Sequence, residues 1–500
     1  MTDPKTRPEV WFLTGSQHLY GEATLRRVAE DGRAVAAHLD GCGRLPVRVV
    51  WRPTLTGSDE ILAACREANA SDACVGVVAW MHTFSPARMW IAGLTRLEKP
   101  LAHLHTQFNR ELPWATIDMD FMNLNQSAHG DREFGFIAAR LRRERKIVVG
   151  HWQDEDVLAA LDGWARSALA LAESRALRIA RFGGMNMRDV AVTGGDRVEA
   201  QIRLGWSVNG YGVGDLVGRI ADVGEAEIDR TIEEYQSLYD LAPAVRRAGD
   251  RHALLRDAAR QEIAIRAFLR EGRFGAFTTT FEDLHGLKQL PGLACQRLMA
   301  EGYGFGAEGD WKTAGLVRLM KTLSAGRTGG VSFMEDYTYD LTRGRELVLG
   351  AHMLEVCPSI AAGRPSLEVH PLGIGGKADP CRLVFEAAPG PASAATLVDM
   401  GGRMRLIVAE LDVVKAPAPM PRLPVARAVW VPRPDFRRGC EAWILAGGAH
   451  HTSFGRAVAA GELEDLAAMA GLECVRIGAG TDLRALRNEL RWNDAAYRAR

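Results

Sequence analysis

The sequence predicts an α/β protein with two Rossmann-like, doubly wound α/β domains followed by an antiparallel, β-barrel-like C-terminal domain. The first third of the chain alternates short apolar runs with amphipathic helical patterns, as in a parallel sheet covered by helices. A second alternation begins near Leu177. After about Gly329 the apolar runs are short and separated by Gly and Pro, which is typical of antiparallel β-structure.

The length of the chain sets the number of domains. At 500 residues it exceeds what one hydrophobic core usually supports. We therefore expect an N-terminal α/β domain over residues 1–175, a central α/β domain over 176–328 and a C-terminal β-rich domain over 329–500.

In the first domain, strands are predicted at Val10–Thr14, Val47–Trp51, Cys74–Trp80, Leu101–His105 and Ile147–Gly150. Helices are predicted at Glu22–Leu39, Ser58–Asn69, Pro86–Leu97, Glu133–Arg145 and Asp154–Ala172. Ser58 precedes Ile61, Leu62 and Cys65, so it is the predicted N-cap of its helix.

The central domain is predicted to contain strands Leu177–Phe182 and Phe274–Thr280 and helices Leu287–Ala300 and Trp311–Leu323. β-type runs then follow at Ser332–Glu335, Glu346–Ala351, Leu367–Leu372, Arg382–Ala387, Thr396–Met400 and Met404–Val413. Gly401 and Gly402 indicate a hairpin turn. The chain is expected to close with helix Ser453–Met469, strand Cys474–Ile477 and helix Thr481–Leu490.

Composition excludes several classes of function. The formal net charge is zero, so no electrostatic argument favours a nucleic acid or an anionic membrane as partner. The polar start and the absence of a long apolar run indicate neither a signal peptide nor a membrane span. The eight cysteines form no CxxC pair, so we expect reduced thiols in a cytoplasmic protein.

Two carboxylates and two imidazoles in the last two hundred residues are the strongest candidates for chemistry. Glu308, Glu335, His352 and His451 each lie beside Gly or at the end of an apolar run, where a strand is expected to give way to a loop. Mixed oxygen and nitrogen ligands suit a borderline divalent ion such as Mn²⁺. The spacing alone leaves open a second interpretation, in which these are ordinary loop charges. Since His450 and His451 are adjacent, at most one of them is expected to bind the ion directly.

Polar residues also follow the strands of the first domain. Gly15-Ser16-Gln17-His18-Leu19-Tyr20-Gly21 is not the GxGxxG pattern of a dinucleotide site. Gln17, Leu19 and Tyr20 could contact a small polyol, although the segment could equally be a βα turn. His82, His103 and His105 end further strands and are interpreted as structural histidines. Glu282 and Asp283 are either supporting acids or solvated loop charges.

Several long motifs occur along the chain in one fixed order. They are Glu9-Val10-Trp11-Phe12, the Gly15–Gly21 segment, His82-Thr83-Phe84-Ser85-Pro86-Ala87, His105-Thr106-Gln107-Phe108-Asn109, Asp118-Met119-Asp120-Phe121-Met122-Asn123, Thr278-Thr279-Thr280-Phe281-Glu282-Asp283-Leu284, Glu308-Gly309-Asp310-Trp311-Lys312, Leu372-Gly373-Ile374-Gly375-Gly376-Lys377 and Gly447-Gly448-Ala449-His450-His451-Thr452. With these motifs in this order, the chain resembles the L-arabinose isomerase family over essentially its whole length.

The resemblance implies roles for individual residues. The family's metal ligands fall on Glu308, Glu335, His352 and His451, and the two glutamates would also transfer protons. Family substrate contacts fall on Gln17, Leu19, Phe84, His129, Met187, Phe281, Tyr337 and Ile374. The loop Arg181–Arg188 is one residue longer than the usual family form, so the pocket methionine is Met185 or Met187, and local order favours Met187. The resemblance also implies the family's three-domain fold and a homohexamer in which neighbouring subunits contribute to each pocket.

The implied reaction is the isomerisation of L-arabinose to L-ribulose, with D-galactose as a second substrate and one Mn²⁺ per subunit as cofactor. A divalent ion would stabilise the developing enediolate so that a carboxylate can remove the proton from C2. Three alternatives are a ketol-isomerase of the L-fucose type, a non-catalytic sugar-binding protein and a metallohydrolase.

Overall fold

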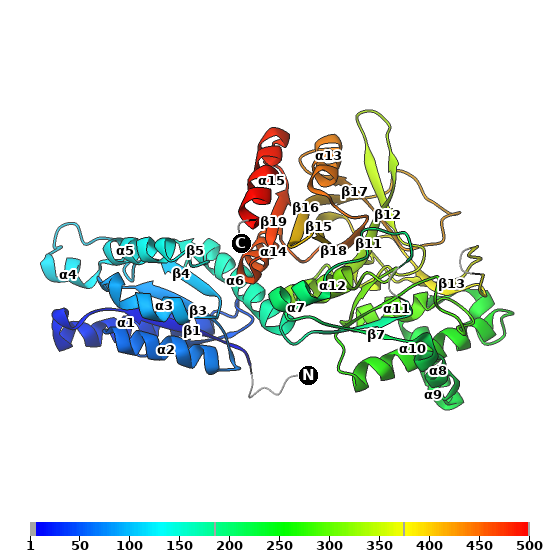
Figure 1. The fold of residues 1–500 in the computed structure, drawn as a ribbon, viewed down its shortest axis with the longest axis horizontal. Coiled ribbons are helices and arrows are strands. Elements are labelled where there is room, and N and C mark those ends of the chain that lie inside the picture. Colours follow the sequence, from blue (N-terminus) through cyan, green and yellow to red (C-terminus); the bar gives the residue numbers. More distant parts are fainter. Residues whose placement is uncertain (1–6, 185–186, 374–375, 499–500) are drawn as a thin grey trace. The chain divides into compact units, whose positions relative to one another are not determined.

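The structure is a computed structural model that describes residues 7–184, 187–373 and 376–498. The chain forms two compact units, residues 1–172 and residues 173–500. Parallel-sheet α/β architecture in the first unit and in the first part of the second is followed by a closed antiparallel β-barrel (Figure 1). The predicted fold class is therefore confirmed.

The first unit is a parallel five-stranded sheet, among the residues described, with strand order β2-β1-β3-β4-β5. The strands are β1 (Glu9–Gly15), β2 (Arg48–Trp51), β3 (Cys74–Met81), β4 (Leu101–His105) and β5 (Lys146–Val149). The central strand β3 is buried along its whole length because helices cover both faces of a doubly wound sheet. Helical segments are η2 (His18–Tyr20), α1 (Gly21–Gly41), α2 (Ser58–Ala70), η3 (Ala87–Trp90), α3 (Ile91–Arg96), α4 (Met119–Leu124), α5 (Ser127–Arg140) and α6 (Glu155–Ser174).

Two details of the first unit differ from the sequence prediction. Ser58 is the first residue of α2 rather than its N-cap, a position that Gly57 holds without a side-chain hydrogen bond. Helix α5 begins at Ser127 and ends at Arg140, whereas the prediction was Glu133–Arg145. The helix ends early because Arg142 has a positive φ of 53°, which an α-helix does not allow.

The second unit begins with a parallel sheet of order β10-β9-β6-β7 in the described chain. Its strands are β6 (Arg178–Phe182), β7 (Ser207–Tyr211), β9 (Ala276–Thr279) and β10 (Gly304–Gly306). Helical segments are α7 (Arg197–Leu204), α8 (Val213–Ala221), α9 (Glu225–Leu238), η4 (Pro243–Val245), α10 (His252–Glu271), α11 (Gly292–Ala300) and α12 (Trp311–Leu323). Helix α11 starts five residues after the predicted Leu287, directly after Pro291, since proline is not accommodated inside a helix.

The barrel closes over the strand order β15-β18-β11-β12-β17-β16 through a further pairing of β15 with β16, as far as the described residues show. Strand β19 (Glu473–Ile477) adds to β16 in parallel. The barrel strands are β11 (Val331–Asp340), β12 (Leu347–Ala351), β15 (Gly390–Asp399), β16 (Met404–Val414), β17 (Arg427–Pro432) and β18 (His451–Gly455). A separate small sheet contains β8 (Asp240–Leu241), β13 (Ser366–Val369) and β14 (Cys381–Val384). The remaining elements are η5 (Pro358–Ile360), α13 (Phe436–Ala446), α14 (Ala460–Ala470) and α15 (Leu483–Arg498).

The predicted helix Ser453–Met469 is wrong in its first part. Residues His451–Gly455 form strand β18, which is buried throughout and lies between β15 and β11. The helix begins only at Ala460, where the Glu462 carboxylate accepts a hydrogen bond from the Ala459 amide. Tertiary pairing with two strands therefore overrides the local helical preference of this segment. No helix among the described residues has the length and apolar character needed to cross a membrane.

Candidate active site

Strand β11 and its two neighbours position three of the four candidate residues of the second unit. Glu335 lies within β11 and is in register with His451 of β18 on one side and Ala351 of β12 on the other. His352 follows Ala351 directly, so it lies at the end of the neighbouring strand. The sequence predicts all four residues at positions where strands give way to loops. Instead, Glu335 lies inside a strand and His451 begins one, because barrel pairing extends through both residues.

Glu308 comes from the parallel sheet rather than from the barrel. It follows β10 in a turn closed by a hydrogen bond from the Asp310 amide to the Ala307 carbonyl, and Gly309 donates to Thr279 O at the end of β9. Glu308 and Gly309 have positive φ angles of 59° and 77°, as both central residues of a type I′ turn require. The turn thus presents a carboxylate at the carboxyl edge of the sheet, where α/β proteins bind ligands.

These residues converge. Nε2 of His451 lies 3.1 Å from Glu335 Oε1 and 3.6 Å from Glu308 Oε2. Nε2 of His352 lies 3.5 Å from the same Glu335 oxygen. Glu308, Glu335 and His352 offer ligand atoms within 4.8 Å of one another, as do Glu308, His450 and His451. Four of the predicted residues are therefore brought together from segments far apart in the sequence.

The donor set fits a divalent cation. Nε2 of His451 is buried and lacks a hydrogen-bond partner among the described residues, because the Glu335 oxygen lies outside hydrogen-bond geometry despite its distance. A buried nitrogen without a partner is costly unless it binds something. Two imidazole nitrogens and two carboxylates suit Mn²⁺ or a similar ion.

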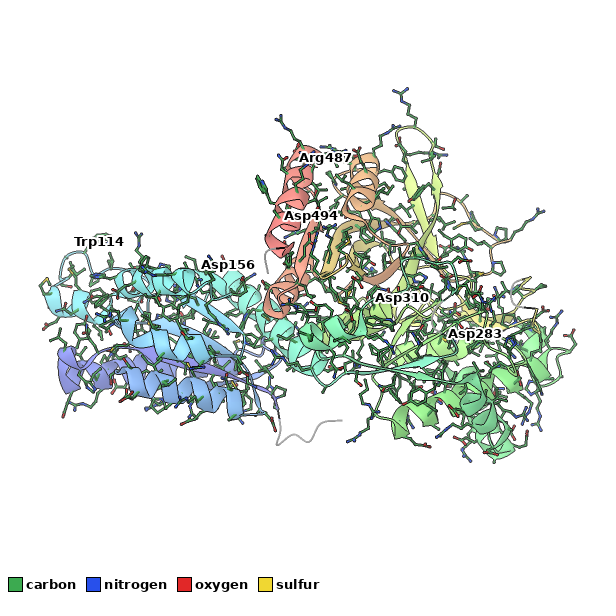
Figure 2. The ribbon with its side chains drawn as sticks, viewed as in Figure 1. Trp114, Asp156, Asp283, Asp310, Arg487 and Asp494 are labelled. Carbon is green, nitrogen blue, oxygen red and sulfur yellow. The ribbon has the colours of Figure 1, made fainter. Side chains whose placement is uncertain are left out.

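Both histidines are oriented by a carboxylate at the other ring nitrogen. Nδ1 of His451 lies 3.1 Å from Asp310 Oδ2, and Nδ1 of His352 lies 2.5 Å from Glu355 Oε2. Such pairs fix the tautomer and ring orientation of metal-binding histidines. Asp310, which is labelled in Figure 2, is also the N-cap of α12. Its carboxylate accepts hydrogen bonds from the backbone amides of Lys312 and Thr313.

The sequence patterns assign no role to Asp310 or Glu355. A signal for Asp310 was present, because Asp310-Trp311-Lys312-Thr313 is a helix N-cap pattern next to Glu308. Glu355 lies three residues after His352, but that spacing is uninformative without knowledge of the loop conformation.

The charges in the cluster balance one another. Burial lowers the pKa of His451, but contacts with Asp310 and Glu335 outweigh burial and raise it to about 9. Burial raises the pKa of Glu335, whereas contact with His451 and the charge of His352 bring it below its ordinary value. For His352, burial is outweighed by Glu355, which raises the pKa. Without an ion, protons on the imidazoles compensate the carboxylates, and a cation would replace those protons.

An apolar wall borders the cluster. The Phe281 ring stacks on His352 with a centroid distance of 6.1 Å and an interplanar angle of 12°. Phe281, Leu284, Leu290 and Leu354 form a small buried cluster, against which Met187 packs. The Met187 amide also donates to Glu308 O at 3.4 Å.

Three further residues of the second unit are predicted substrate contacts or alternatives to them. Tyr337 lies on β11 with 53% of its surface exposed. Ile374 and Met185, the alternative to Met187, lie outside the described residues.

Three of the predicted contacts of the first unit lie together. Gln17 Nε2 donates to the Phe84 carbonyl at 3.0 Å, and the Phe84 and His129 rings are 4.8 Å apart. Leu19, in η2, is 83% exposed. The structure therefore brings Gln17, Phe84 and His129 together.

The histidines at the ends of β3 and β4 have structural partners. His82 Nε2 is 2.8 Å from Asp31 Oδ2, and its ring stacks on Trp80 at 4.5 Å. His103 and His105 both contact the Asp131 carboxylate at 2.7 Å. These contacts account for all three residues as parts of the fold of the first unit.

The parallel sheets and the barrel define an α/β protein whose second unit brings paired carboxylates and imidazoles into one cluster. Three family models match the chain: the L-arabinose isomerase N-terminal domain over residues 4–176, the central domain over 178–326 and the C-terminal domain over 330–473. The chain belongs to the L-arabinose isomerase family and is an isomerase.

Relatives match over nearly the whole length. L-arabinose isomerase from Geobacillus thermodenitrificans is 60% identical over 492 residues, which cover 98% of this chain and 99% of the relative. Those from Herpetosiphon aurantiacus and a Nocardioides species are 59% and 57% identical, covering 98% and 100% of this chain and 97% and 99% of theirs. Among solved structures, a putative branched-chain amino acid ABC transporter from Rhodospirillum rubrum matches with a TM-score of 0.16 and 12% identity over 67% of this chain and 73% of that one. That likeness is too weak to inform the fold.

Proposed function

We propose that this protein converts L-arabinose to L-ribulose through an enediol, using a divalent cation, Mn²⁺, held by Glu308, Glu335, His352 and His451. The observation that carries the proposal is the convergence of two carboxylates with two imidazole Nε2 atoms, each ring oriented at Nδ1 by a further carboxylate. Family membership over all three domain models supports the sugar.

The reaction moves a proton from C2 to C1 of the open-chain sugar and exchanges the oxidation level of the two carbons. A bound divalent cation would supply stabilisation of negative charge on the sugar oxygens. Glu308 and Glu335 face the same space from two different elements, so one can remove the proton while the other exchanges a proton with oxygen. Ionised Glu335, whose pKa lies below its ordinary value, starts in the form that a base needs.

The side chains around the cluster provide selectivity. Phe281, Met187 and their apolar neighbours form an apolar surface that can pack against the carbon atoms of a sugar. Such a surface also excludes water, which strengthens electrostatic interactions in the site. Following the family resemblance, we also propose Gln17, Leu19, Phe84, His129, Tyr337 and Ile374 as substrate contacts. D-Galactose, which has the L-arabinose configuration at C2 to C4 and one extra hydroxymethyl group, is proposed as a slower substrate.

A ketose assay tests the proposal. Purified protein is stripped with chelator and incubated with L-arabinose, with and without added Mn²⁺. L-Ribulose should form only with the ion, and L-fucose should react far more slowly. Lack of ketose formation from any aldose would reject an isomerase of this substrate class, and preferential reaction of L-fucose would favour the related ketol-isomerase.

We also propose, from the family resemblance, that the protein assembles as a homohexamer. Light scattering on the purified full chain measures the mass directly. A monomeric mass at micromolar concentration would reject this assembly without affecting the proposed chemistry.

A further inference from the structure

Helix α12 begins with two charged residues that are almost completely buried. Asp310 is the N-cap of α12, and Lys312, two residues later, is only 1% exposed. A buried ammonium is costly unless its protons are used in hydrogen bonds and a counter-charge lies close by. The contacts of Lys312 therefore indicate why a lysine occupies this position.

Lys312 Nζ uses its donors on two different parts of the site. It donates to the carbonyls of Val192 and Gly194 and contacts Asp310 Oδ1 at 3.1 Å. Val192 and Gly194 belong to the segment that follows the pocket residue Met187. The lysine stem also fits this segment closely, because a Cβ added to Gly195 would lie 3.0 Å from Lys312 Cδ.

Asp310 carries the connection from Lys312 to the cation ligands. Its Oδ1 faces Lys312, whereas its Oδ2 accepts from Thr313 Oγ1 at 2.7 Å and lies 3.1 Å from His451 Nδ1. The direction of the His451 ring, and hence the position of Nε2 beside Glu335, depends on where Asp310 Oδ2 lies. Lys312 is thus three contacts away from the proposed cation, through Asp310 and His451, and one contact away from the segment that follows Met187.

We propose that Lys312 is a positioning residue that couples the two halves of the site: through Asp310 it orients His451 for the cation, and through Val192 and Gly194 it holds the loop that carries Met187. This inference rests on the proposed function, since it concerns the same cation site. It assigns to Lys312 no contact with the substrate and no proton transfer.

The same helix supplies a matched control. Lys321 is a second largely buried lysine of α12, and its Nζ donates to the Val331 carbonyl at 2.8 Å and lies 3.7 Å from Cys357 Sγ. Among the described residues, it makes no hydrogen bond or ion pair with Asp310 or with residues 192–194. Lys312→Met and Lys321→Met therefore remove the same charge from the same helix, but only the first removes the connection to His451.

The test is Mn²⁺ titration by calorimetry on the full-length, chelator-stripped wild type and both variants, with melting temperatures measured in parallel. Both variants should melt at lower temperature. Only Lys312→Met should bind Mn²⁺ more weakly, by about 10- to 100-fold, the range found when a group supporting a metal ligand is lost. Hydrogen exchange of residues 190–195 should also accelerate in Lys312→Met and not in Lys321→Met.

Further variants separate a positioning role from a loss of folding. If Lys312 acts through Asp310, the Asp310→Asn, Lys312→Met double variant should bind Mn²⁺ no more weakly than Asp310→Asn alone. Should Lys312→Met not fold, Lys312→Gln, which keeps two donors and loses the charge, replaces it with the same expected direction.

Mn²⁺ affinity in the Lys312 variant within about twofold of wild type, or an equal loss in Lys321→Met, would overturn the coupling while leaving the proposed isomerase intact. A wild type that neither binds Mn²⁺ nor forms ketose would reject the proposed function and this inference together.

Discussion

His352 and His451 present the same ring atom, Nε2, toward the glutamates, and each uses Nδ1 to contact a buried carboxylate. The two rings come from strands on opposite sides of β11. Phe333, two residues before Glu335, packs edge-on against both rings at 5.0 Å. Each imidazole is thus fixed by a carboxylate and by an aromatic edge, which leaves little rotational freedom to lose when a ligand binds.

Glu308→Gln and Glu335→Gln should each lower the turnover number by about 100- to 10,000-fold, since an amide cannot accept or donate the proton that the reaction moves. Circular dichroism should show both variants folded. Glu233→Gln, on the exposed face of α9, is the control and should retain wild-type turnover. Near-normal activity in either site variant would remove that glutamate from the mechanism.

The two adjacent histidines should differ in their effect on Mn²⁺ binding. His451 is fully buried and held by Asp310, whereas His450 is 43% exposed, although its Nε2 also lies 3.6 Å from Glu308. We therefore expect His451→Ala to weaken Mn²⁺ binding far more than His450→Ala, as measured by calorimetry. The reverse order would identify His450 as the ligand in the alternative group Glu308, His450 and His451.

Among the elements of the first unit, the carboxylate of Asp131 joins helix α5 to β4. Asp131 of α5 contacts His103 and His105 and accepts from the Met81 amide at 3.3 Å. The hydrogen bond to Asp131 raises the pKa of His105 above its ordinary value. A raised folded-state pKa adds stability that is fully present below the unfolded-state pKa and is lost as pH rises through the folded-state pKa.

The loss of stability caused by His105→Gln should therefore be larger near about pH 5.5 than near about pH 9. Thermal denaturation of wild type and variant at both pH values measures the difference. In an Asp131→Asn background the same substitution should have no such pH dependence, because the partner charge is absent. An effect of His105→Gln that does not change with pH would mean that the neutral form of the ring makes the same contribution.

For the molecule as a whole, the cluster joins two architectures. Glu308 lies at the edge of the parallel sheet β10-β9-β6-β7, whereas Glu335, His352 and His451 belong to the barrel. A cation held by all four would cross-link these parts of the second unit. Such an ion stabilises the folded form by an amount set by its concentration relative to its dissociation constant, about 2.7 kcal/mol at a hundredfold excess.

Mn²⁺ should consequently raise the melting temperature of the wild type, and should do so much less in the Glu308→Gln, Glu335→Gln double variant. Scanning calorimetry with Mn²⁺ and with chelator measures both shifts. An equal Mn²⁺-induced rise in the two proteins would place the stabilising ion elsewhere and remove the cluster from consideration.

Periodicity was sufficient to locate most strands and helices, including β4 and α12 at their observed bounds. It failed at His451–Gly455, where the segment is a strand. Local sequence favours a continuous helix there, but pairing with β11 and β15 decides the conformation. Similarly, apolar spacing alone places residues 287–291 inside the predicted helix, whereas α11 begins only after Pro291.

The sequence by itself determined the fold class, the family and the identity of the four candidate residues, because hydrophobic periodicity and long ordered motifs are properties of the linear chain. Only the tertiary structure decided that these residues meet, that Asp310 and Glu355 orient the two imidazoles, and that Lys312 contacts both Asp310 and the 192–194 segment. The physical reason is that strand register in the barrel and the Glu308–Gly309 turn set distances between segments. Those distances depend on long-range pairing, which no local pattern encodes.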